Sequence, residues 1–383
     1  MRTPEDLWWK DIAGAAAYIE DLTDTLNGNR IPVLCSADGL PWPETMQAQV
    51  QEALRSGSGN SDLMVLPIDR HEDPAPVEAC LAGYIPRRLR DCYRGSSAQG
   101  LAVFFRREGC LRNKILWVRC PDEKDLQEWL TFFELYGPSS PETGGCVLEF
   151  TGSPRPDVRK KLARALPYAD YVSRHDVQLF ASLLSRQSDA GRKMPGVWKE
   201  YAAAVAARLC ETDAEFAAAL LEDVDFRHVQ PDLEKLEALA EAHGFRREAA
   251  SAGHITYHIL NGDREEITRR IWAAQVQVLF PLIELETSDI VHRFEKEIAE
   301  ALQAEKVEQY GNRITDIGDV EIGTLYYMMT TRRKSDKESY LFYVREESLR
   351  EKITDLHEFR NRLAHGKLCS PEEADRLMGM DNS

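Results

Sequence analysis

Hydrophobic residues in the first part of the chain fall in short runs that are separated by longer amphipathic stretches. The short runs are bounded by turn-forming or charged residues and have the length of buried strands. Between them, apolar residues recur at steps of three and four, as on the buried face of a helix. This alternation predicts an α/β domain with a mainly parallel sheet over residues 1–155. The predicted strands are 31–35, 63–68, 115–118 and 147–150, with 101–105 as a further candidate, and the clearest helix between them is 123–136.

The pattern becomes helical after Pro154 and Pro156, which mark a domain boundary. Alanine-rich segments such as 202–207 favour helix intrinsically and allow close packing. We therefore predict a helical middle domain over residues 156–262. Its predicted helices are 159–166, 177–184, 197–210 and 214–221, whereas 255–259 has an extended pattern.

A third pattern begins at Asp263, which is a suitable N-cap for a long apolar stripe of helical period. Glu265 and Glu266 fall in the first turn, where the helix dipole favours acidic side chains. Pro371 suits the first position of a short terminal helix. We therefore predict an all-α bundle of four to five helices over residues 263–383. Its predicted helices include 289–304, 320–329 and a final long helix that begins between 345 and 349 and ends at residue 365.

The final long helix of this bundle is amphipathic. Leu356, Phe359 and Leu363 recur at steps of three and four, so they share one apolar face. Gly366 then suits the left-handed position that commonly follows a helix.

Three polar residues at the end of this helix form a candidate chemical site. Asn361 and His365 are four residues apart and lie on one face, and Arg360 lies at the edge of that face. Arginine offers a fixed fork of hydrogen-bond donors, and histidine titrates near neutral pH. Together with the amide, these groups are suited to handling phosphate.

The pattern Arg360-Asn361-x-x-x-His365-Gly366 resembles the R-x4-6-H signature of the HEPN superfamily, and the helix predicted over 320–329 also looks like that family. The resemblance covers roughly the last hundred residues. It implies a metal-independent endoribonuclease with Arg360, Asn361 and His365 as catalytic residues. HEPN domains typically pair so that two motifs face each other, which implies a homodimer through the C-terminal bundle. Proteins of this kind commonly belong to bacterial antiphage defence or toxin systems.

Several other polar residues near the motif are candidate RNA contacts, and each has a structural alternative. His357 extends the row of Asn361 and His365 by one turn, but an exposed helical histidine needs no function. The turn 332–337 is the best local basic patch, and as a solvated turn it needs no function either. The candidate RNA contacts are His357, Arg362, Arg332, Arg333, Lys334 and Lys337.

The predicted α/β domain is reminiscent of P-loop NTPase domains of the AAA/STAND type, but it lacks their phosphate-binding loop. Such a loop needs glycines that admit backbone amides and a lysine that reaches the terminal phosphates. The segment 36–42, which follows the first predicted strand, contains no Gly-Lys-Ser/Thr. Asp122 and Glu123 are displaced from the place of a metal-holding acidic pair. We therefore expect a degenerate P-loop-like domain, or an unrelated α/β fold, that serves as a sensor or scaffold and regulates the C-terminal domain or binds a protein partner.

The bulk composition restricts the choice of partners and cofactors. The chain has 383 residues and a formal net charge of −16, which argues against a general nucleic-acid coat protein because phosphate binding depends on cationic surface. A nuclease would need a local basic patch. The eight cysteines include no C-x-x-C pair, so a zinc ribbon is not expected. We expect no metal and no cofactor, and we interpret four histidines as structural or surface residues: His228, His243, His254 and His258.

The chain has no long apolar run, and its polar start has no signal-peptide core. We therefore expect a cytoplasmic protein without a membrane segment.

Two alternative functions stay open at this point. The C-terminal bundle could be a non-catalytic HEPN domain that serves in dimerisation or interaction. Arg360 and His365 would then make polar contacts at the dimer interface. The whole chain could also be a nucleotide-responsive regulator that uses the P-loop-like domain. RNA is the substrate only under the ribonuclease hypothesis.

Overall fold

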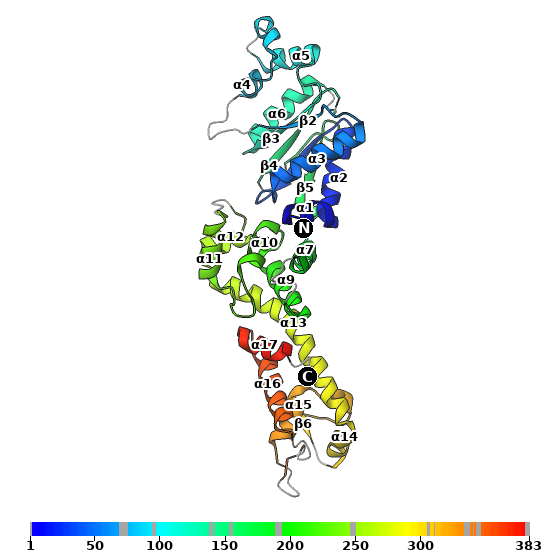
Figure 1. The fold of residues 1–383 in the computed structure, drawn as a ribbon, viewed down its shortest axis with the longest axis vertical. Coiled ribbons are helices and arrows are strands. Elements are labelled where there is room, and N and C mark those ends of the chain that lie inside the picture. The colour runs from blue at the N-terminus through cyan, green and yellow to red at the C-terminus, as the bar shows by residue number, and fades with distance from the viewer. Residues whose placement is uncertain are drawn as a thin grey trace. The chain divides into compact units, whose positions relative to one another are not determined.

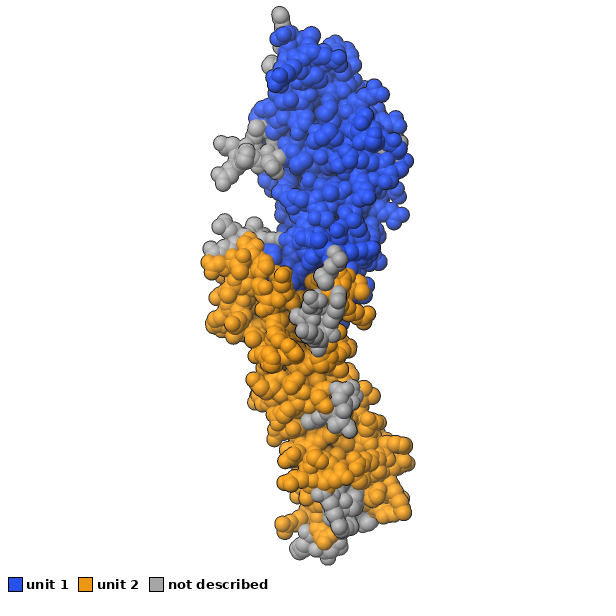
Figure 2. All heavy atoms as spheres, in the orientation of Figure 1, with its two compact units in different colours: residues 1–180, 210–218, 245–257 blue, residues 181–209, 219–244, 258–383 orange. Residues whose placement is uncertain are grey.

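The chain folds into two compact units in the computed structural model (Figure 2). Unit 1 comprises Met1–Phe180, Cys210–Ala218 and Phe245–Tyr257, and unit 2 comprises Ala181–Leu209, Ala219–Gly244 and His258–Ser383. The structure describes residues 2–68, 76–93, 97–137, 140, 142–152, 156–187, 194–245, 250–304, 307–309, 311–332, 338–339, 341 and 346–379.

Unit 1 is built on a five-stranded sheet with the strand order β2-β3-β4-β1-β5 (Figure 1). Every pair of neighbouring strands is parallel, which confirms the predicted α/β class. The sheet continues beyond the predicted boundary near residue 155, because β5 pairs with β1 from Ile31 opposite Ala163 to Cys35 opposite Pro167. The strands are β1 Ile31–Ser36, β2 Met64–Ile68, β3 Lys114–Cys120, β4 Gly145–Thr151 and β5 Ala163–Pro167.

Helices cover both faces of this sheet, as the apolar strands of a parallel sheet require. Val33, Val118 and Leu148 belong to a core that is shared with α4, α5 and α6. Their neighbours in the strands point to the opposite face, and there the hydroxyl of Tyr18 on α2 donates to the carbonyl of Leu166, at 3.1 Å. The helices of this region are α1 Pro4–Asp11, α2 Ala13–Asn27, α3 Pro43–Ser58, α4 Val77–Ala82, η1 Arg87–Cys92, α5 Ala98–Glu108 and α6 Glu123–Tyr136.

Three short segments adopt a different structure from the predicted one. The candidate strand 101–105 lies in helix α5, where Leu101 and Phe105 are buried on one face and Val103 is 55% exposed. The predicted helix 159–166 contains strand β5 instead, because pairing with β1 decides its conformation. The segment 255–259, which was expected to be extended, lies in helix α12, Ile255–Leu260.

Unit 2 is mainly helical, and its C-terminal helices pack around the long helix α13 (Figure 1). Helix α13 contacts α14, α16 and α17, and α16 also packs against α15. It begins after the predicted N-cap Asp263, whose side chain accepts from the Glu266 N–H, and it includes Pro281. These five helices are α13 Arg264–Arg293, α14 Glu295–Ala304, α15 Ile322–Thr330, α16 Glu347–Ala364 and α17 Pro371–Gly379.

In sequence order, the remaining elements either follow the last strand of the sheet and precede α13, or connect α14 to α15. A two-residue antiparallel pair, β6 Glu308–Gln309 and β7 Asn312–Arg313, precedes η3 Ile317–Asp319. None of the described helices combines the length and the apolar character needed to cross a bilayer. The helices between the sheet and α13, with one short 3-10 turn, are η2 Tyr168–Asp170, α7 Arg174–Gln187, α9 Gly196–Cys210, α10 Ala214–Asp223, α11 Leu233–Ala242 and α12 Ile255–Leu260.

Replacing Gly144 by alanine should destabilise unit 1. Gly144 has a φ of +102°, and a Cβ there would lie 2.4 Å from the carbonyl oxygen of Leu111. We expect the free energy of unfolding to fall by about 2 kcal/mol or more. As a control, Gly57→Ala in helix α3 meets no atom within 4 Å and should be neutral or stabilising, by up to about 1 kcal/mol. Urea unfolding followed by tryptophan fluorescence measures both, and equal midpoints for Gly144→Ala and wild type would contradict the interpretation.

Candidate functional site

The candidate site lies on helix α16, and the apolar face of this helix is buried as predicted. Leu356, Phe359 and Leu363 are at most 1% exposed. Leu349 and Ile353 extend the same stripe toward the start of the helix. Because this stripe is turned into unit 2, the polar residues of the last turns emerge beside it at the surface.

The end of α16 has the left-handed backbone conformation that was predicted at Gly366. Gly366 has a φ of +71°, in the left-handed region. Its N–H donates to the carbonyl of Leu363 at 3.2 Å, and the Lys367 N–H donates to the carbonyl of Arg362 at 2.9 Å. These two bonds form a Schellman motif, with His365 as the C-cap residue. The motif fixes the backbone on which His365 is carried.

Buried polar contacts from α13 hold this end of α16 in place. The Trp272 indole N–H donates to the carbonyl of Leu363 at 2.8 Å. The Gln275 amide is 1% exposed; it donates to the Cys369 carbonyl and accepts from the Cys369 N–H, both at 2.8 Å. It also donates to the Tyr201 hydroxyl at 3.1 Å. The segment that carries His365 is therefore fixed to the core of unit 2 on both sides.

Arg360, Asn361 and His357 form a connected row of polar side chains. The Arg360 guanidinium donates to Oδ1 of Asn361 at 3.4 Å. This contact orients the amide so that its Nδ2 donates to Nε2 of His357, at 3.0 Å. His357 then accepts through Nε2, which is the arrangement of a neutral imidazole with its proton on Nδ1. The structure thus brings together two of the predicted catalytic residues and the candidate contact His357.

Helix α15 supplies two further members that the sequence analysis did not identify as site residues. The Tyr326 ring stacks on His357, with the ring centroids 4.0 Å apart and the planes 6° from parallel. Glu321 lies 3.7 Å from the Arg360 guanidinium. Both residues belong to the segment 320–329, which the sequence predicted as a helix. The sequence does not show that this helix packs against α16.

His365 and Arg362 differ in the contacts that their side chains make. His365 is exposed, and the structure shows no hydrogen bond between its imidazole and the Asn361 side chain. Its backbone N–H donates to the Asn361 carbonyl at 3.0 Å. Arg362, a candidate RNA contact, pairs with Glu373 on α17 at 2.8 Å. The imidazole of His365 is therefore accessible from solvent, whereas the Arg362 guanidinium is partly neutralised.

The predicted basic patch is described only in part. Arg332 is exposed and forms an isolated antiparallel bridge with Ser339. Arg333, Lys334 and Lys337 lie outside the described residues.

The histidines of the middle region are engaged by carboxylates. Each of His228, His243, His254 and His258 lies within 4.0 Å of an aspartate oxygen. Among the described residues, no group of three or more His, Cys, Asp or Glu side chains is arranged to hold a metal ion.

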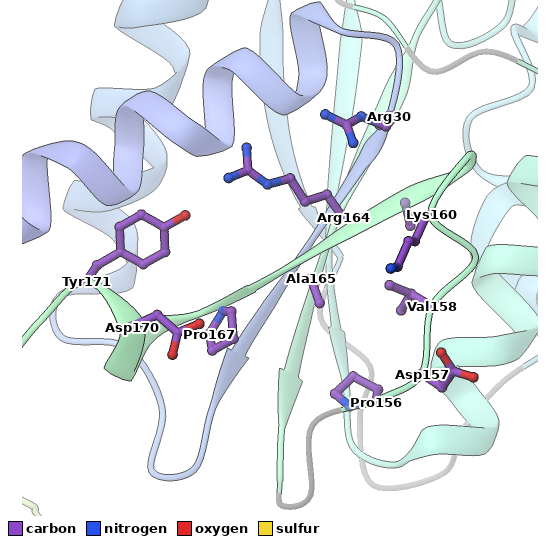
Figure 3. Close-up of a pocket in the computed structure, with 11 residues that line it drawn as sticks. Arg30, Pro156, Asp157, Val158, Lys160, Arg164, Ala165, Pro167, Asp170 and Tyr171 are labelled. Atoms are coloured by element: carbon purple, nitrogen blue, oxygen red, sulfur yellow. The ribbon is translucent and has the colours of Figure 1, made fainter.

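Unit 1 has a separate cavity beside its edge strand β5, with a volume of about 870 Å³ (Figure 3). Arg164 on β5 pairs there with Asp21 at 2.7 Å. The Tyr171 hydroxyl also donates to Asp21, and both contacts lower the pKa of this carboxyl, the tyrosine contact more strongly. The sequence analysis did not identify this surface, although the basic residues of 159–164 offered a signal for it. Its charged lining residues are Arg30, Lys160, Arg164, Asp157 and Asp170.

No model of a known protein family matches the sequence, and no curated protein is significantly similar to it.

The partly buried position of His357 should make the stability of unit 2 depend on pH. The pKa of His357 is lowered from its ordinary value of 6.5, first because burial disfavours the charged imidazole and second because Arg360 is near, while Glu358 acts in the opposite direction. Below pH 6.5 the unfolded chain therefore binds more protons at this residue than the folded chain does. Stability contributed by neutral His357 is complete above that pH and is lost as the pH falls toward the folded pKa.

Comparing urea unfolding of wild type and His357→Gln from about pH 7.5 down to about pH 5.5 measures this effect. We expect the glutamine variant to lose less stability than wild type on acidification. His292→Gln is the matched control, because the His292 side chain is 88% exposed and should contribute little to the slope. Identical slopes for wild type and His357→Gln would contradict the assignment.

Proposed function

We propose that this protein is a metal-independent endoribonuclease whose reacting groups are carried by the end of helix α16. The observation that carries the proposal is the juxtaposition of Arg360 and Asn361, joined by a hydrogen bond, with an exposed His365 one turn further along a fixed helix end. The Schellman motif and the α13 contacts fix the helix, so the three residues start from a defined backbone geometry.

The chemistry available to these groups is transesterification within RNA. A base removes the proton of a 2′-hydroxyl, the resulting oxygen attacks the adjacent phosphorus, and an acid protonates the leaving 5′-oxygen. His365 suits the proton transfers because its side chain is exposed and histidine is the residue most often used as a general acid or base. Arg360 suits the phosphate, because a guanidinium can bind two of its oxygens and stabilise the charge of the transition state.

Asn361 has a positioning role in this scheme. Its amide joins Arg360 to His357, and His357 is held by the face of Tyr326. These contacts restrict the guanidinium to the polar side of α16. Glu321 is 54% exposed and 3.7 Å away, so RNA phosphate can replace it as the partner of Arg360 at little cost.

One copy of the proposed site provides one histidine, His365, and one arginine, Arg360, for the chemistry, whereas the reaction uses both an acid and a base. A symmetric dimer that brings two α16 ends together would supply the second pair. We include this homodimer, formed through the C-terminal bundle, in the proposal. Unit 1 would regulate the nuclease or bind a protein partner, and antiphage defence or a toxin system is the proposed setting.

A second candidate function is a non-catalytic interaction domain. The ion pair of Arg360 with Glu321 and the stacking of Tyr326 on His357 favour it, because both tie α16 to α15 and are useful to a bundle without any chemistry. Under this alternative, replacing Arg360 lowers stability or assembly and changes no catalytic rate.

Wild type should cleave RNA in the presence of EDTA, and Arg360→Ala and His365→Ala should each reduce the cleavage rate by about 100-fold or more, because each removes a proton-transfer or charge-stabilising group. Asn361→Ala should have a smaller effect. The rate is measured on labelled RNA, with the unfolding midpoint of every variant recorded beside it.

Arg350→Ala on the same helix and His292→Ala on α13 are the matched controls, because both remove exposed groups of the same chemical types away from the motif. Their rates should equal that of wild type. Cleavage that disappears with the chelator, or that is equal in all variants, would refute the proposed mechanism. Loss of stability in Arg360→Ala without any activity in wild type would favour the interaction domain.

Dilution should test the paired arrangement. If the reacting groups come from two chains, the cleavage rate per chain falls when the protein is diluted below its dimer dissociation constant. Sedimentation measurements over the same concentrations supply that constant. A rate per chain that stays constant while the dimer dissociates would show that one chain is sufficient.

A further inference from the structure

A strongly basic stretch of the chain lies in unit 1, over residues 87–114. It carries seven arginines and one lysine against two acidic residues, so its formal net charge is +6, whereas that of the whole chain is −16. The turn 332–337, the basic patch predicted from the sequence, has a formal net charge of +3. A nuclease that is acidic overall needs a local cationic surface to hold a phosphate backbone, and this stretch is a candidate for it.

The described part of this stretch forms two neighbouring surface elements, the turn η1 and the helix α5. Tyr93, the C-cap residue of η1, packs its ring against that of Phe104 on α5, with the centroids 5.1 Å apart. The guanidinium of Arg107 lies over the Phe104 ring, 5.7 Å from its centroid. A contact of two rings and one cation therefore holds η1 beside α5, and α5 in turn contacts α4 and α6 (Figure 1).

The apolar side chains of these two elements are turned inward, and the arginines lie on the outside. Leu101 and Phe105 of α5 belong to the core of unit 1, and Leu89 of η1 packs against it. Three arginines come from η1, two from the last turn of α5 and one from the loop before β3. All six are exposed: Arg87, Arg88, Arg90, Arg106, Arg107 and Arg112. Arg94 lies outside the described residues.

Three of these arginines have a structural role in unit 1. Arg107 pairs with the adjacent Glu108 at 2.7 Å, and Arg90 donates to a backbone carbonyl at 3.5 Å. Arg106 lies against the end of α6, since a Cβ added at Gly137 would be 3.1 Å from its guanidinium carbon. Arg106 and Arg107 also complement the dipole of α5 in its last turn. These contacts explain the three residues without a ligand.

The other three, Arg87, Arg88 and Arg112, are not neutralised within the described part of the chain. None of them forms an ion pair or a side-chain hydrogen bond with another residue there. Exposed groups of like charge raise the local positive potential, which attracts a polyanion from solution. Seven of the eight basic residues of the stretch are arginines, whose planar fork of donors binds two phosphate oxygens at once.

An extended polyanion fits this distribution of charge. The arginines are spread over η1, the last turn of α5 and the loop that follows it. Phosphates repeated along a nucleic-acid strand can meet several of these groups at once, whereas a small anion bridges only neighbouring groups. Guanidinium planes can also stack on the bases of a single strand, which an acidic protein segment does not offer.

We propose that the surface formed by η1 and the end of α5 binds the phosphate backbone of single-stranded RNA. Arg87, Arg88 and Arg112 pair with phosphates, and Arg90 and Arg107 add to the positive potential around them. The identity of the polyanion rests on the proposed ribonuclease function, but the residues that bind it are not those assigned to the reaction. Since phosphates carry no sequence information, the binding is independent of sequence and falls steeply with salt.

Fluorescence anisotropy of the full chain with a labelled 2′-O-methyl RNA strand tests this proposal. The strand keeps its phosphates but has no free 2′-hydroxyl, so binding is measured without cleavage. The double variant Arg87→Ala, Arg88→Ala should bind at least about tenfold more weakly. A plot of log affinity against log salt should become shallower by about 0.7 for each phosphate contact removed. Arg112→Ala is an independent variant with a smaller effect in the same direction.

Lys124→Ala is the matched control in unit 1. The Lys124 side chain is 86% exposed in the first turn of α6, at the opposite end of that helix from Gly137 and Arg106. Its affinity and salt dependence should equal those of wild type, and neither polyglutamate nor phosphatidylserine vesicles should displace the RNA at equal concentration of charge. The proposal is overturned by absence of RNA binding in wild type, by undiminished affinity in both arginine variants, or by displacement with either competitor.

Cleavage of unmodified RNA by the same proteins separates this proposal from the ribonuclease proposal. Wild type that binds RNA through these arginines but does not cleave it would refute the ribonuclease and leave the binding surface in place. Cleaving wild type with a double variant that binds equally well would refute the binding surface alone. If both proposals hold, the double variant should raise KM and leave kcat unchanged, because its arginines take no part in the reaction.

Discussion

The burial of one apolar stripe on helix α16 is the constraint on which the candidate site depends. Leu356, Phe359 and Leu363 must be removed from water, and this requirement sets the rotation of the helix about its own axis. Once that rotation is set, Arg360 and Asn361 can only emerge at the surface beside α15. The Trp272 indole N–H then donates to the Leu363 carbonyl in the last turn, which also accepts from the Gly366 N–H, so this helix end is tied to α13.

Much of this arrangement could be predicted from the sequence, because it depends on local signals. The period of the stripe, the glycine after the helix and the spacing of Arg360 and His365 are all read from consecutive residues. The four apolar runs assigned as strands and helix 123–136 were predicted correctly for the same reason. The contacts of Tyr326 and Glu321 could not be predicted, since they depend on which helix packs against α16.

Where local signals and tertiary contacts disagreed, the tertiary contacts decided the structure. The run 101–105 is apolar enough for a strand, yet it packs Leu101 and Phe105 into the core of the sheet as one face of helix α5. The segment at β5 has helical spacing but completes a sheet, because an unpaired edge of β1 would otherwise be left open. The contacts of Asp38 with Ser251 and of Asp213 with His254 join segments that are far apart in the sequence, and no local pattern predicts them.

The path of the chain between the two units also decides whether the protein can be cut into two folded fragments. The chain passes between units 1 and 2 after residues 180, 209, 218, 244 and 257, so the two units are interleaved in sequence. A fragment that ends at residue 180 would keep all five strands of the sheet but would lose Asp213, Ser251 and His254 together. Such a fragment would lack Ser251, which holds Asp38 in the loop after β1, and the complementary fragment would carry that residue without the sheet. Truncation at residue 180 would therefore leave unit 1 incomplete, whereas a single residue change in the intact chain leaves both units whole.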